Sequence, residues 1–396
     1  MPTKPARATA TDNPGLTVLR SLLSVLCAPH RLIESVRILR DIQAGRGAGR
    51  AVHVAAIAYQ PRGESRTGDL YRSDKPLAGL VLVPGATRLG KDDPRLIAFA
   101  QALARARFEV LVPDLPGLMH LRVRADDADI IADALLVLSQ HRAAHGNATV
   151  GIVAISYSTG PAMIALLDAH VRGTAQFMLA IGGYYDIEAV IAFITTGCYR
   201  NPSDNARRYR VPDEYGRWVF ALSNATALEN DRDRELLEAM AHKKLADTRA
   251  DISDLAAGLG DEGRRIYAVV ENRDPDRVPA LIAVLPSKIV DEIARLDLKR
   301  RDLSPLDMRF ILTHGNDDAM IPETESTALA GALPGADLFV LNSMKHVDPG
   351  PAGLADTLKM LAAIQGLLQE RDRVRPPKTP VGESPLQLPP GRCGGG

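Results

Sequence analysis

Short runs of apolar residues, separated by stretches with helical periodicity, are the feature of this sequence that most restricts its fold. Most of the runs are continuous and rich in Val, Ile and Leu, which is typical of strands buried on both faces of a parallel sheet. Strands that alternate with helices predict an α/β fold, in which a mostly parallel, doubly wound sheet carries helices on both faces. The predicted strands are 52–59, 68–72, 79–83, 109–112, 148–154, 177–181, 308–313 and 337–341, and the predicted helices of this pattern are 95–106, 125–138, 161–170, 324–333 and 353–369.

The sheet pattern is interrupted at 187–306, where helical patterns occur without a convincing strand. The chain has 396 residues, more than the roughly 100–200 of an ordinary domain, so one large domain with an insertion is expected. An insertion of this length between two strands predicts a helical cap over one end of the sheet. The expected parts are a disordered N-terminus, an N-terminal amphipathic helix, a two-part α/β core, the cap and a disordered Pro/Gly-rich tail, at 1–14, 15–48, 49–186 with 307–370, 187–306 and 371–396.

Composition and motif content exclude several classes of function. Lys and Arg total 48, and Asp and Glu total 48, so the net charge of zero gives no general attraction to nucleic acid. The three cysteines are too few and too scattered for a disulfide framework or a zinc site. The sequence has no glycine-rich phosphate loop and no acidic or histidine cluster with metal-ligand spacing. We therefore expect no cofactor, no metal ion and no nucleic-acid partner, and the oligomeric state stays open.

The N-terminal segment departs from this charge balance. Residues 1–50 carry eight Lys or Arg residues against three Asp or Glu residues. A basic amphipathic helix at 15–42 is able to rest on an anionic membrane surface, or to pack on its own protein as apolar helix faces more often do. Its apolar run is too short to span a bilayer, which needs about 20 residues. We expect a cytoplasmic protein, with membrane association or export through this segment as the alternatives.

A serine lies at a predicted strand-to-helix corner. Ser156 follows the strand at 148–154 and precedes the apolar helix at 161–170. The small residues Ala154 and Ser158 flank it at positions −2 and +2, as a nucleophile elbow requires, because strand and helix pass close together there. The usual elbow has glycine at both positions, and a serine at a helix start is often only a cap. The motif alone therefore leaves both roles open.

Two later loops carry the other side chains that a nucleophilic serine needs. The segment HGNDD at 314–318 follows the predicted strand at 308–313, and the segment SMKH at 343–346 follows the last strand. Ligands of such sheets bind beyond the carboxyl ends of the strands, where all three loops are expected to lie. The chain order of serine, aspartate and histidine is the one known for hydrolases built on this type of sheet.

Together with two further segments, these three loops resemble the α/β-hydrolase family. The matching pieces, all within residues 50–370, are PGAT at 84–87, VPDLPG at 112–117, AISYS at 154–158, HGNDDAMIP at 314–322 and SMKH at 343–346. The stretch 84–117 and the segment IPETES also resemble an uncharacterised, esterase- and lipase-like bacterial group. The resemblance implies that Ser156 is the nucleophile, Asp318 the triad acid and His346 the general base.

The resemblance also implies an oxyanion hole and a substrate pocket. The backbone N–H groups of Ala86 and Tyr157 would stabilise the developing negative charge. Thr87, Tyr184 and Tyr185 are candidate pocket residues, although both tyrosines are equally suited to packing in the core or against the cap.

Alternatives to some of these assignments stay open. Asp186 follows the strand at 177–181 and is the alternative acid. Asp318 is preferred over Asp317, because the acid in the family lies three residues after the glycine of the HG pair. His314 and His120 are expected to be structural, since neither is on the loop after the last strand.

The expected function is a serine hydrolase, similar to carboxylesterases and lipases, that cleaves a carboxylic ester through an acyl-enzyme. Its partner would be a small ester that enters under the cap. A thioesterase or an amidase would use the same triad. A non-catalytic protein that binds a ligand through the same cleft is the alternative from another class.

Overall fold

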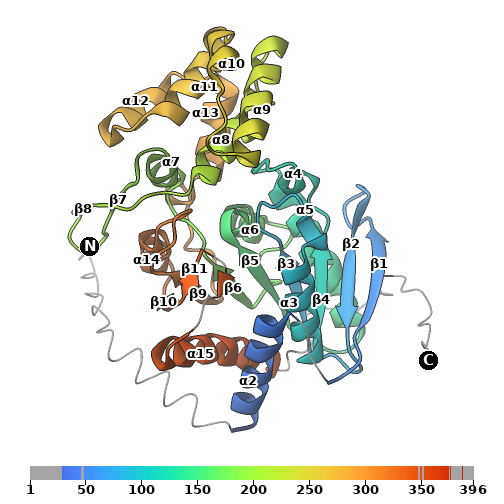
Figure 1. Ribbon diagram of the computed structural model, residues 1–396. Helices are drawn as coiled ribbons and strands as arrows, with labels where there is room; N and C mark the ends of the chain where they lie inside the picture. The colour runs from blue at the N-terminus through green and yellow to red at the C-terminus, as the bar shows by residue number, and fades with distance from the viewer. Residues whose placement is uncertain are drawn as a thin grey trace, which may run out of the picture.

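The computed structural model describes residues 29–45, 49–346, 348–349, 352–373, 375 and 386. Its main feature is an eight-stranded sheet with the strand order β1-β2-β4-β3-β5-β6-β9-β10 (Figure 1). Strands β1 and β2 pair antiparallel with each other, β2 pairs antiparallel with β4, and the other pairs are parallel. The prediction of a mostly parallel α/β sheet is therefore confirmed. The strands are β1 (His53–Tyr59), β2 (Arg66–Arg72), β3 (Ala78–Val83), β4 (Phe108–Pro113), β5 (Val150–Ile155), β6 (Phe177–Ile181), β9 (Arg309–Gly315) and β10 (Asp337–Leu341).

Helices cover both faces of the sheet because its central strands are apolar on both sides. Alternate residues of β3 belong to two separate hydrophobic clusters, with Val81 and Val83 in one and Leu80 and Leu82 in the other. The first cluster includes α5 (Asp127–Ala144), α6 (Thr159–Leu167) and α14 (Glu323–Ala332), and the second includes α2 (Pro29–Ala44), α3 (Pro94–Arg105) and α15 (Leu354–Arg371). The doubly wound arrangement follows from this two-sided burial.

The described part of the N-terminal helix packs on its own protein. Helix α2 (Pro29–Ala44) lies beside α15, and its Ile38 is buried among the residues of α3 and α15 (Figure 1). An ion pair joins Glu34 to Arg371, and another joins Arg31 to Asp372. The predicted N-terminus at 1–14 and the first part of the predicted helix, 15–28, lie outside the described residues. Within the described residues, none of the helices is long and apolar enough to cross a membrane.

The chain between β6 and β9 forms the inserted segment, which lies beyond one end of the sheet (Figure 1). It is mostly helical, but it also contains a short antiparallel hairpin of β7 and β8 that corrects the expectation of a segment without strands. These strands are three residues long, and all three residues of β8 are exposed, so the strands leave no apolar alternation in the sequence. The elements are α7 (Ile187–Thr196), β7 (Cys198–Arg200), β8 (Arg207–Tyr209), α8 (Glu214–Ala225), α9 (Asp231–Ala246), α10 (Ser253–Ala257), α11 (Asp261–Glu271), α12 (Val278–Ala283) and α13 (Ser287–Leu296).

The described residues of the C-terminal tail are held against the fold, which corrects the prediction of disorder at 371–396 for that part. The carbonyl of Arg373 accepts a hydrogen bond of 2.6 Å from Thr149 Oγ1, and the carbonyl of Arg375 accepts one of 3.0 Å from the Ala148 N–H. Leu386 is 5% exposed and belongs to the larger hydrophobic cluster. Low-complexity composition predicts disorder from the tail alone, whereas these contacts depend on the loop before β5.

Gly160 of α6 lies directly against Tyr184 in the loop after β6, so a larger residue at position 160 should destabilise the fold. A methyl group on Gly160 would overlap the hydroxyl of Tyr184, which is fully buried and donates a hydrogen bond of 3.1 Å to the Leu296 carbonyl. We expect Gly160→Ala to lower the free energy of unfolding by about 1–3 kcal/mol through overpacking. In urea unfolding, the control Gly331→Ala, in α14 with no atom within 4 Å of the added methyl, should be neutral or stabilising. Equal stabilities of the two variants would contradict the contact.

Candidate active site

Ser156 occupies a strained corner between β5 and α6. Strand β5 ends at Ile155, a single 3₁₀ turn spans Ser156–Ser158, and α6 begins at Thr159. Ser156 has a φ of +58°, in the left-handed region that L-residues other than glycine rarely adopt. The hydroxyl of Ser158 stabilises the corner, because it accepts a hydrogen bond of 3.0 Å from the Ile155 N–H and donates one of 2.8 Å to the Ile155 carbonyl. The residue at position +2 therefore has a local role that glycine would not supply.

The loop after β3 passes beside this corner. A Cβ atom built on Gly85 would lie 3.6 Å from Ser156 Cβ and 3.5 Å from the Ile155 carbonyl oxygen. Ala86 follows directly, and its carbonyl oxygen lies 3.5 Å from the Tyr215 hydroxyl of the inserted segment. The two segments that carry the predicted oxyanion donors, Ala86 and Tyr157, are thus neighbours of Ser156. Their role as donors stays a prediction.

Ser156, His346 and Asp318 form one hydrogen-bonded series. The distance from Ser156 Oγ to His346 Nε2 is 2.9 Å, and the distance from His346 Nδ1 to Asp318 Oδ2 is 2.8 Å. The three side chains follow the ends of β5, β9 and β10. His346 lies 190 positions after Ser156 and 28 positions after Asp318 along the chain. The sheet brings together the three residues that the sequence singled out.

A glycine at the end of β9 allows the histidine loop to approach. A Cβ atom on Gly315 would overlap the carbonyl oxygen of Met344, two residues before His346. His346 itself has a φ of +51°, so its backbone is also held in the left-handed region. Glycine is therefore required for steric reasons at position 315 of the HG pair, since a larger residue there would displace the segment that carries His346.

The carboxylate of Asp318 is fully buried, and both of its oxygens have hydrogen-bond partners. Its Oδ1 atom accepts hydrogen bonds from the N–H groups of Met320 at 2.7 Å and Ile321 at 2.9 Å, and its Oδ2 atom contacts His346 and, at 3.2 Å, His314 Nε2. Burial acts to raise the pKa of Asp318, but the hydrogen bonds from His314 and His346 outweigh it and hold that pKa well below its usual range. The group is therefore ionised at neutral pH.

The other two histidines discussed above do not contact Ser156. His314 is fully buried on β9, where Nδ1 lies 2.7 Å from Ser326 Oγ and Nε2 lies 2.8 Å from the Ile321 carbonyl oxygen. His120 is exposed after the short helix α4 (Pro116–Met119), and its Nδ1 lies 2.8 Å from the Pro116 carbonyl oxygen. His314 supports the acid, and His120 closes a helix end.

Arg210, which sequence reasoning missed, connects the inserted segment to the acid loop. Its guanidinium donates hydrogen bonds to the carbonyls of Asp318 at 2.8 Å and Asn316 at 2.7 Å, and it pairs with Glu323 at 3.1 Å. It also lies over the ring of Tyr199, 5.0 Å from the centroid. No sequence signal separates this arginine from its neighbours Arg207 and Arg208, because its partners are backbone atoms of a distant loop.

Asp186, the alternative acid, has other partners. Its Oδ1 atom accepts a hydrogen bond of 3.0 Å from the Ala189 N–H and so caps α7, and its Oδ2 atom pairs with Lys299 Nζ at 2.8 Å. Asp317, next to the acid, is exposed. The histidine of the series contacts Asp318 and neither of these two.

Of the two roles left open for Tyr184, pocket residue or packing in the core, its surroundings favour packing. It is fully buried, with its ring 6.3 Å from that of Tyr157 and its hydroxyl bonded to the Leu296 carbonyl. Gly160 leaves the space that the Tyr184 ring fills, so the residue packs in the core. Tyr185 is partly buried, and its N–H donates to Glu325 at 3.0 Å. Thr87 is partly buried and forms a turn in which its carbonyl accepts a hydrogen bond from the Gly90 N–H.

Within the described part of the chain, no group of three or more His, Cys, Asp or Glu residues is arranged to hold a metal ion. The arrangement of Ser156, His346 and Asp318 is suited to proton transfer and nucleophilic attack by a hydroxyl group.

Comparison with known proteins yields structural likeness only. No protein-family model matches the sequence, and no curated protein matches it either. The ligand-bound rice cell wall degrading esterase LipA from Xanthomonas oryzae has a TM-score of 0.50 and 16% identity, over 85% of this chain and 94% of that protein. A variant of the same esterase has a TM-score of 0.51 and 16% identity, over 85% and 93%. A serine hydrolase from Cycloclasticus zankles, with 17% identity over 80% and 96%, has a TM-score of only 0.39 and adds nothing to this likeness.

The strained corner predicts an unusual order of stability for substitutions at Ser156. Ser156→Gly relieves the positive φ, whereas Ser156→Ala keeps a Cβ atom in the same conformation. We expect the glycine variant to be more stable than the alanine variant by about 1 kcal/mol in urea unfolding, the reverse of the usual order. An alanine variant as stable as the glycine variant, or more so, would show that the corner is not strained.

Proposed function

Because this chain has the α/β-hydrolase fold, we propose that it is a serine hydrolase that cleaves a carboxylic ester. Ser156 is the nucleophile, His346 the general base and Asp318 the acid that orients it. The hydrogen-bonded series from Ser156 Oγ through His346 to Asp318 carries this proposal. A buried, ionised carboxylate bonded to a histidine that in turn contacts a serine at a strained corner has a direct use in nucleophilic catalysis.

The series determines which proton moves first. Ionised Asp318 only accepts hydrogen bonds, so the Nδ1 atom of His346 carries the proton between them and Nε2 is left with a lone pair toward Ser156. Nε2 takes the hydroxyl proton as Ser156 Oγ attacks the ester carbonyl carbon. The carbonyl π electrons move to oxygen, and the resulting oxyanion is stabilised by the N–H groups of Ala86 and Tyr157.

Collapse of this intermediate re-forms the carbonyl and breaks the bond to the alcohol, which takes the proton from His346 as it leaves. A water molecule then gives a proton to Nε2 as its oxygen attacks the acyl carbonyl carbon, and His346 returns this proton to Ser156 Oγ as the bond between Oγ and the acyl carbon breaks, which releases the acid and free Ser156. Throughout, Asp318 stabilises the imidazolium without changing protonation, and its low pKa supports that role.

The inserted segment is proposed to act as the cap of this site. Three contacts support this: Tyr215 reaches the Ala86 carbonyl, Arg210 binds the acid loop, and the Asp213 N–H donates to the Ala319 carbonyl at 2.8 Å. All three join residues 210–215 to loops next to Ser156. A small ester would then bind between this segment and the sheet, and a thioester or an amide would meet the same reactive groups.

One comparison favours cleavage of an ester over cleavage of a thioester or an amide, since the LipA protein is an esterase. The alternative of a ligand-binding protein without catalysis was suggested by the absence of glycine around Ser156. The hydrogen bonds of Ser158 to Ile155 weaken that alternative, because they give the serine at this position a use in the same corner.

Covalent labelling tests the nucleophile. We expect a fluorophosphonate probe to label the full-length protein, and the label to disappear in Ser156→Ala, because among the described residues no other hydroxyl is hydrogen-bonded to His346. The control Ser304→Ala, at an exposed loop position, should be labelled like the wild type when both are analysed by mass spectrometry. A folded wild-type protein that takes no label would favour the ligand-binding alternative, and a label retained in Ser156→Ala would assign the nucleophile to another residue.

Substitution of the two candidate acids tests the orienting role. Asp318→Asn can keep the contacts with Met320 and Ile321, but its amide N–H₂ would face His346 and reverse the tautomer of the ring. We expect the turnover of p-nitrophenyl esters to fall roughly 10,000-fold. The matched control Asp186→Asn should stay within a few fold of the wild type. The reverse result, with Asp186→Asn inactive and Asp318→Asn active, would make Asp186 the acid.

A further inference from the structure

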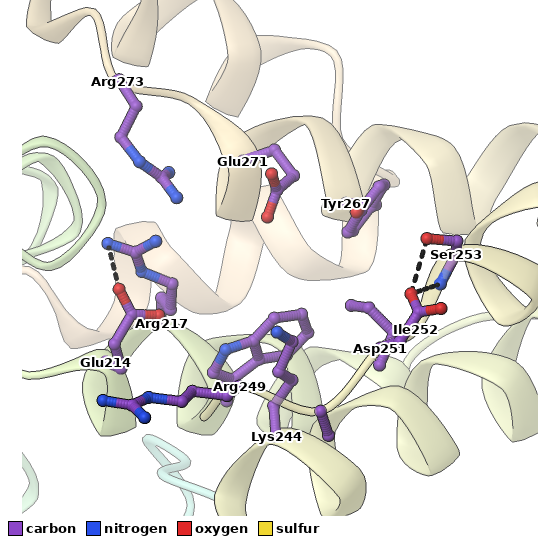
Figure 2. A pocket seen from close by; sticks show the side chains of 12 residues that line it. Glu214, Arg217, Lys244, Arg249, Asp251, Ile252, Ser253, Tyr267, Glu271 and Arg273 are labelled. Carbon is purple, nitrogen blue, oxygen red and sulfur yellow. Dashed lines mark hydrogen bonds and ion pairs between the residues drawn. The ribbon is translucent and has the colours of Figure 1, made fainter. Parts of the chain in front are cut away.

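A cavity of about 430 Å³ lies entirely within the inserted segment, between α8, α9 and α11 and the loop before α10. None of Ser156, Asp318 and His346 lines it. A volume of this size is typical of small-molecule sites, which span roughly 300–1,000 Å³. The residues that line it are Glu214, Arg217, Trp218, Lys244, Arg249, Ala250, Asp251, Ile252, Ser253, Tyr267, Glu271 and Arg273, most of which Figure 2 labels.

Cationic side chains outnumber carboxylates in this lining, and most of the cations have no acidic partner. Arg217 pairs with Glu214 at 3.3 Å, but Lys244, Arg249 and Arg273 form no ion pair with any described carboxylate. Lys244 donates to the Thr248 carbonyl at 3.0 Å, and Arg273 donates to the carbonyls of Val270 and Asn272, both at 2.9 Å. These acceptors are neutral, so these hydrogen bonds do not compensate the positive charge of the two side chains.

Two of the three carboxylates of the lining already have partners. Glu214 is already paired with Arg217, and Asp251 accepts hydrogen bonds from the N–H group of Ser253 at 3.0 Å and from its hydroxyl at 2.6 Å. Glu271 is exposed. In Figure 2, Glu271 and the guanidinium groups of Arg217 and Arg273 point toward one another across the cavity.

Arg217 and Trp218 each bring an unsatisfied buried donor to the cavity. Arg217 is 5% exposed and Trp218 is 2% exposed, yet neither Arg217 Nε nor Trp218 Nε1 has a hydrogen-bond partner among the described residues. A buried donor without a partner costs about 1–3 kcal/mol, so native proteins rarely leave two of them beside one cavity. Burial lowers the pKa of Arg217, and the nearby Arg273 lowers it further, although Glu214 and Glu271 act in the opposite direction.

We propose that this cavity binds a small organic anion that carries more than one carboxylate or phosphate group. The guanidinium groups of Arg217 and Arg273 provide forked donors that match the oxygens of either group, and Lys244 and Arg249 add further positive charge to the lining. Several anionic groups on one ligand would use several of these cations at once. The cavity is also larger than an inorganic anion needs.

The position of the cavity makes this ligand distinct from the proposed substrate. Helix α8 begins with Glu214, whose neighbour Tyr215 contacts the Ala86 carbonyl, whereas Arg217 and Trp218 of the same helix line the cavity. An anion bound there would contact the helix that also reaches the loop beside Ser156. The proposed site itself does not depend on hydrolysis at Ser156.

Titration calorimetry with citrate and with inorganic phosphate tests this proposal on the full-length protein. We expect saturable binding of citrate beyond the heat produced by sodium chloride at equal ionic strength. Arg273→Gln, an exposed position, should weaken the affinity by about tenfold, because a charge-assisted hydrogen bond contributes about this factor. Arg217→Met should weaken it at least as much, and Arg273→Gln alone is sufficient if that buried substitution prevents folding.

Two controls separate this site from its surroundings. Arg264→Gln removes an exposed charge from α11 outside the cavity and should bind citrate like the wild type, as should Ser156→Ala. Binding of citrate without phosphate identifies a polycarboxylate site, and binding of both identifies a site for either group. No saturable citrate heat, an unchanged affinity in Arg273→Gln, or a loss of binding in Ser156→Ala would each overturn the proposal.

Discussion

The fully buried carboxylate of Asp318 joins parts of the chain that are far apart in sequence. An ionised carboxylate loses much of its hydration in a protein interior, so it is stable there only when charged or polar partners surround it. The N–H groups of Met320 and Ile321 and the rings of His314 and His346 meet this need. Each partner comes from the end of a strand or from the loop that follows it. The position of His346, and with it the contact to Ser156, therefore depends on the same interaction that makes the acid loop stable.

Close packing at a few small residues makes this arrangement possible. Gly315 lets the chain near Met344 pass over the end of β9, and Gly160 lets the ring of Tyr184 fill the space behind α6. The positive φ of Ser156 is maintained by its neighbours, since Ser158 bonds both backbone groups of Ile155. The strain at Ser156 is thus compensated by hydrogen bonds within three residues. The two glycines instead allow segments that are distant in the sequence to approach each other closely.

The inserted segment connects to the sheet through residues 210–215 and carries its own charged cavity above them. Arg210 and Tyr215 bind carbonyl groups of the acid loop and of the loop after β3, so both sides of the Ser156 corner contact this segment. The cavity uses the next turn of the same helix. Helix α8 is buried along most of its length because it packs against α9, α11 and α7, so it connects the cavity to the loop beside Ser156.

Strand positions and the three loop residues were predictable from the sequence because they depend on local patterns. A strand buried on both faces needs a continuous apolar run, and Ser156, Asp318 and His346 each follow such a run. Four features were not predictable in this way: the hairpin of β7 and β8, the burial of Tyr184, the contacts of Arg373 and Arg375, and the hydrogen bonds from Arg210 to the acid loop. Their partners are backbone carbonyls or packed rings many residues away, and neither hydrophobic periodicity nor composition records which distant segments meet.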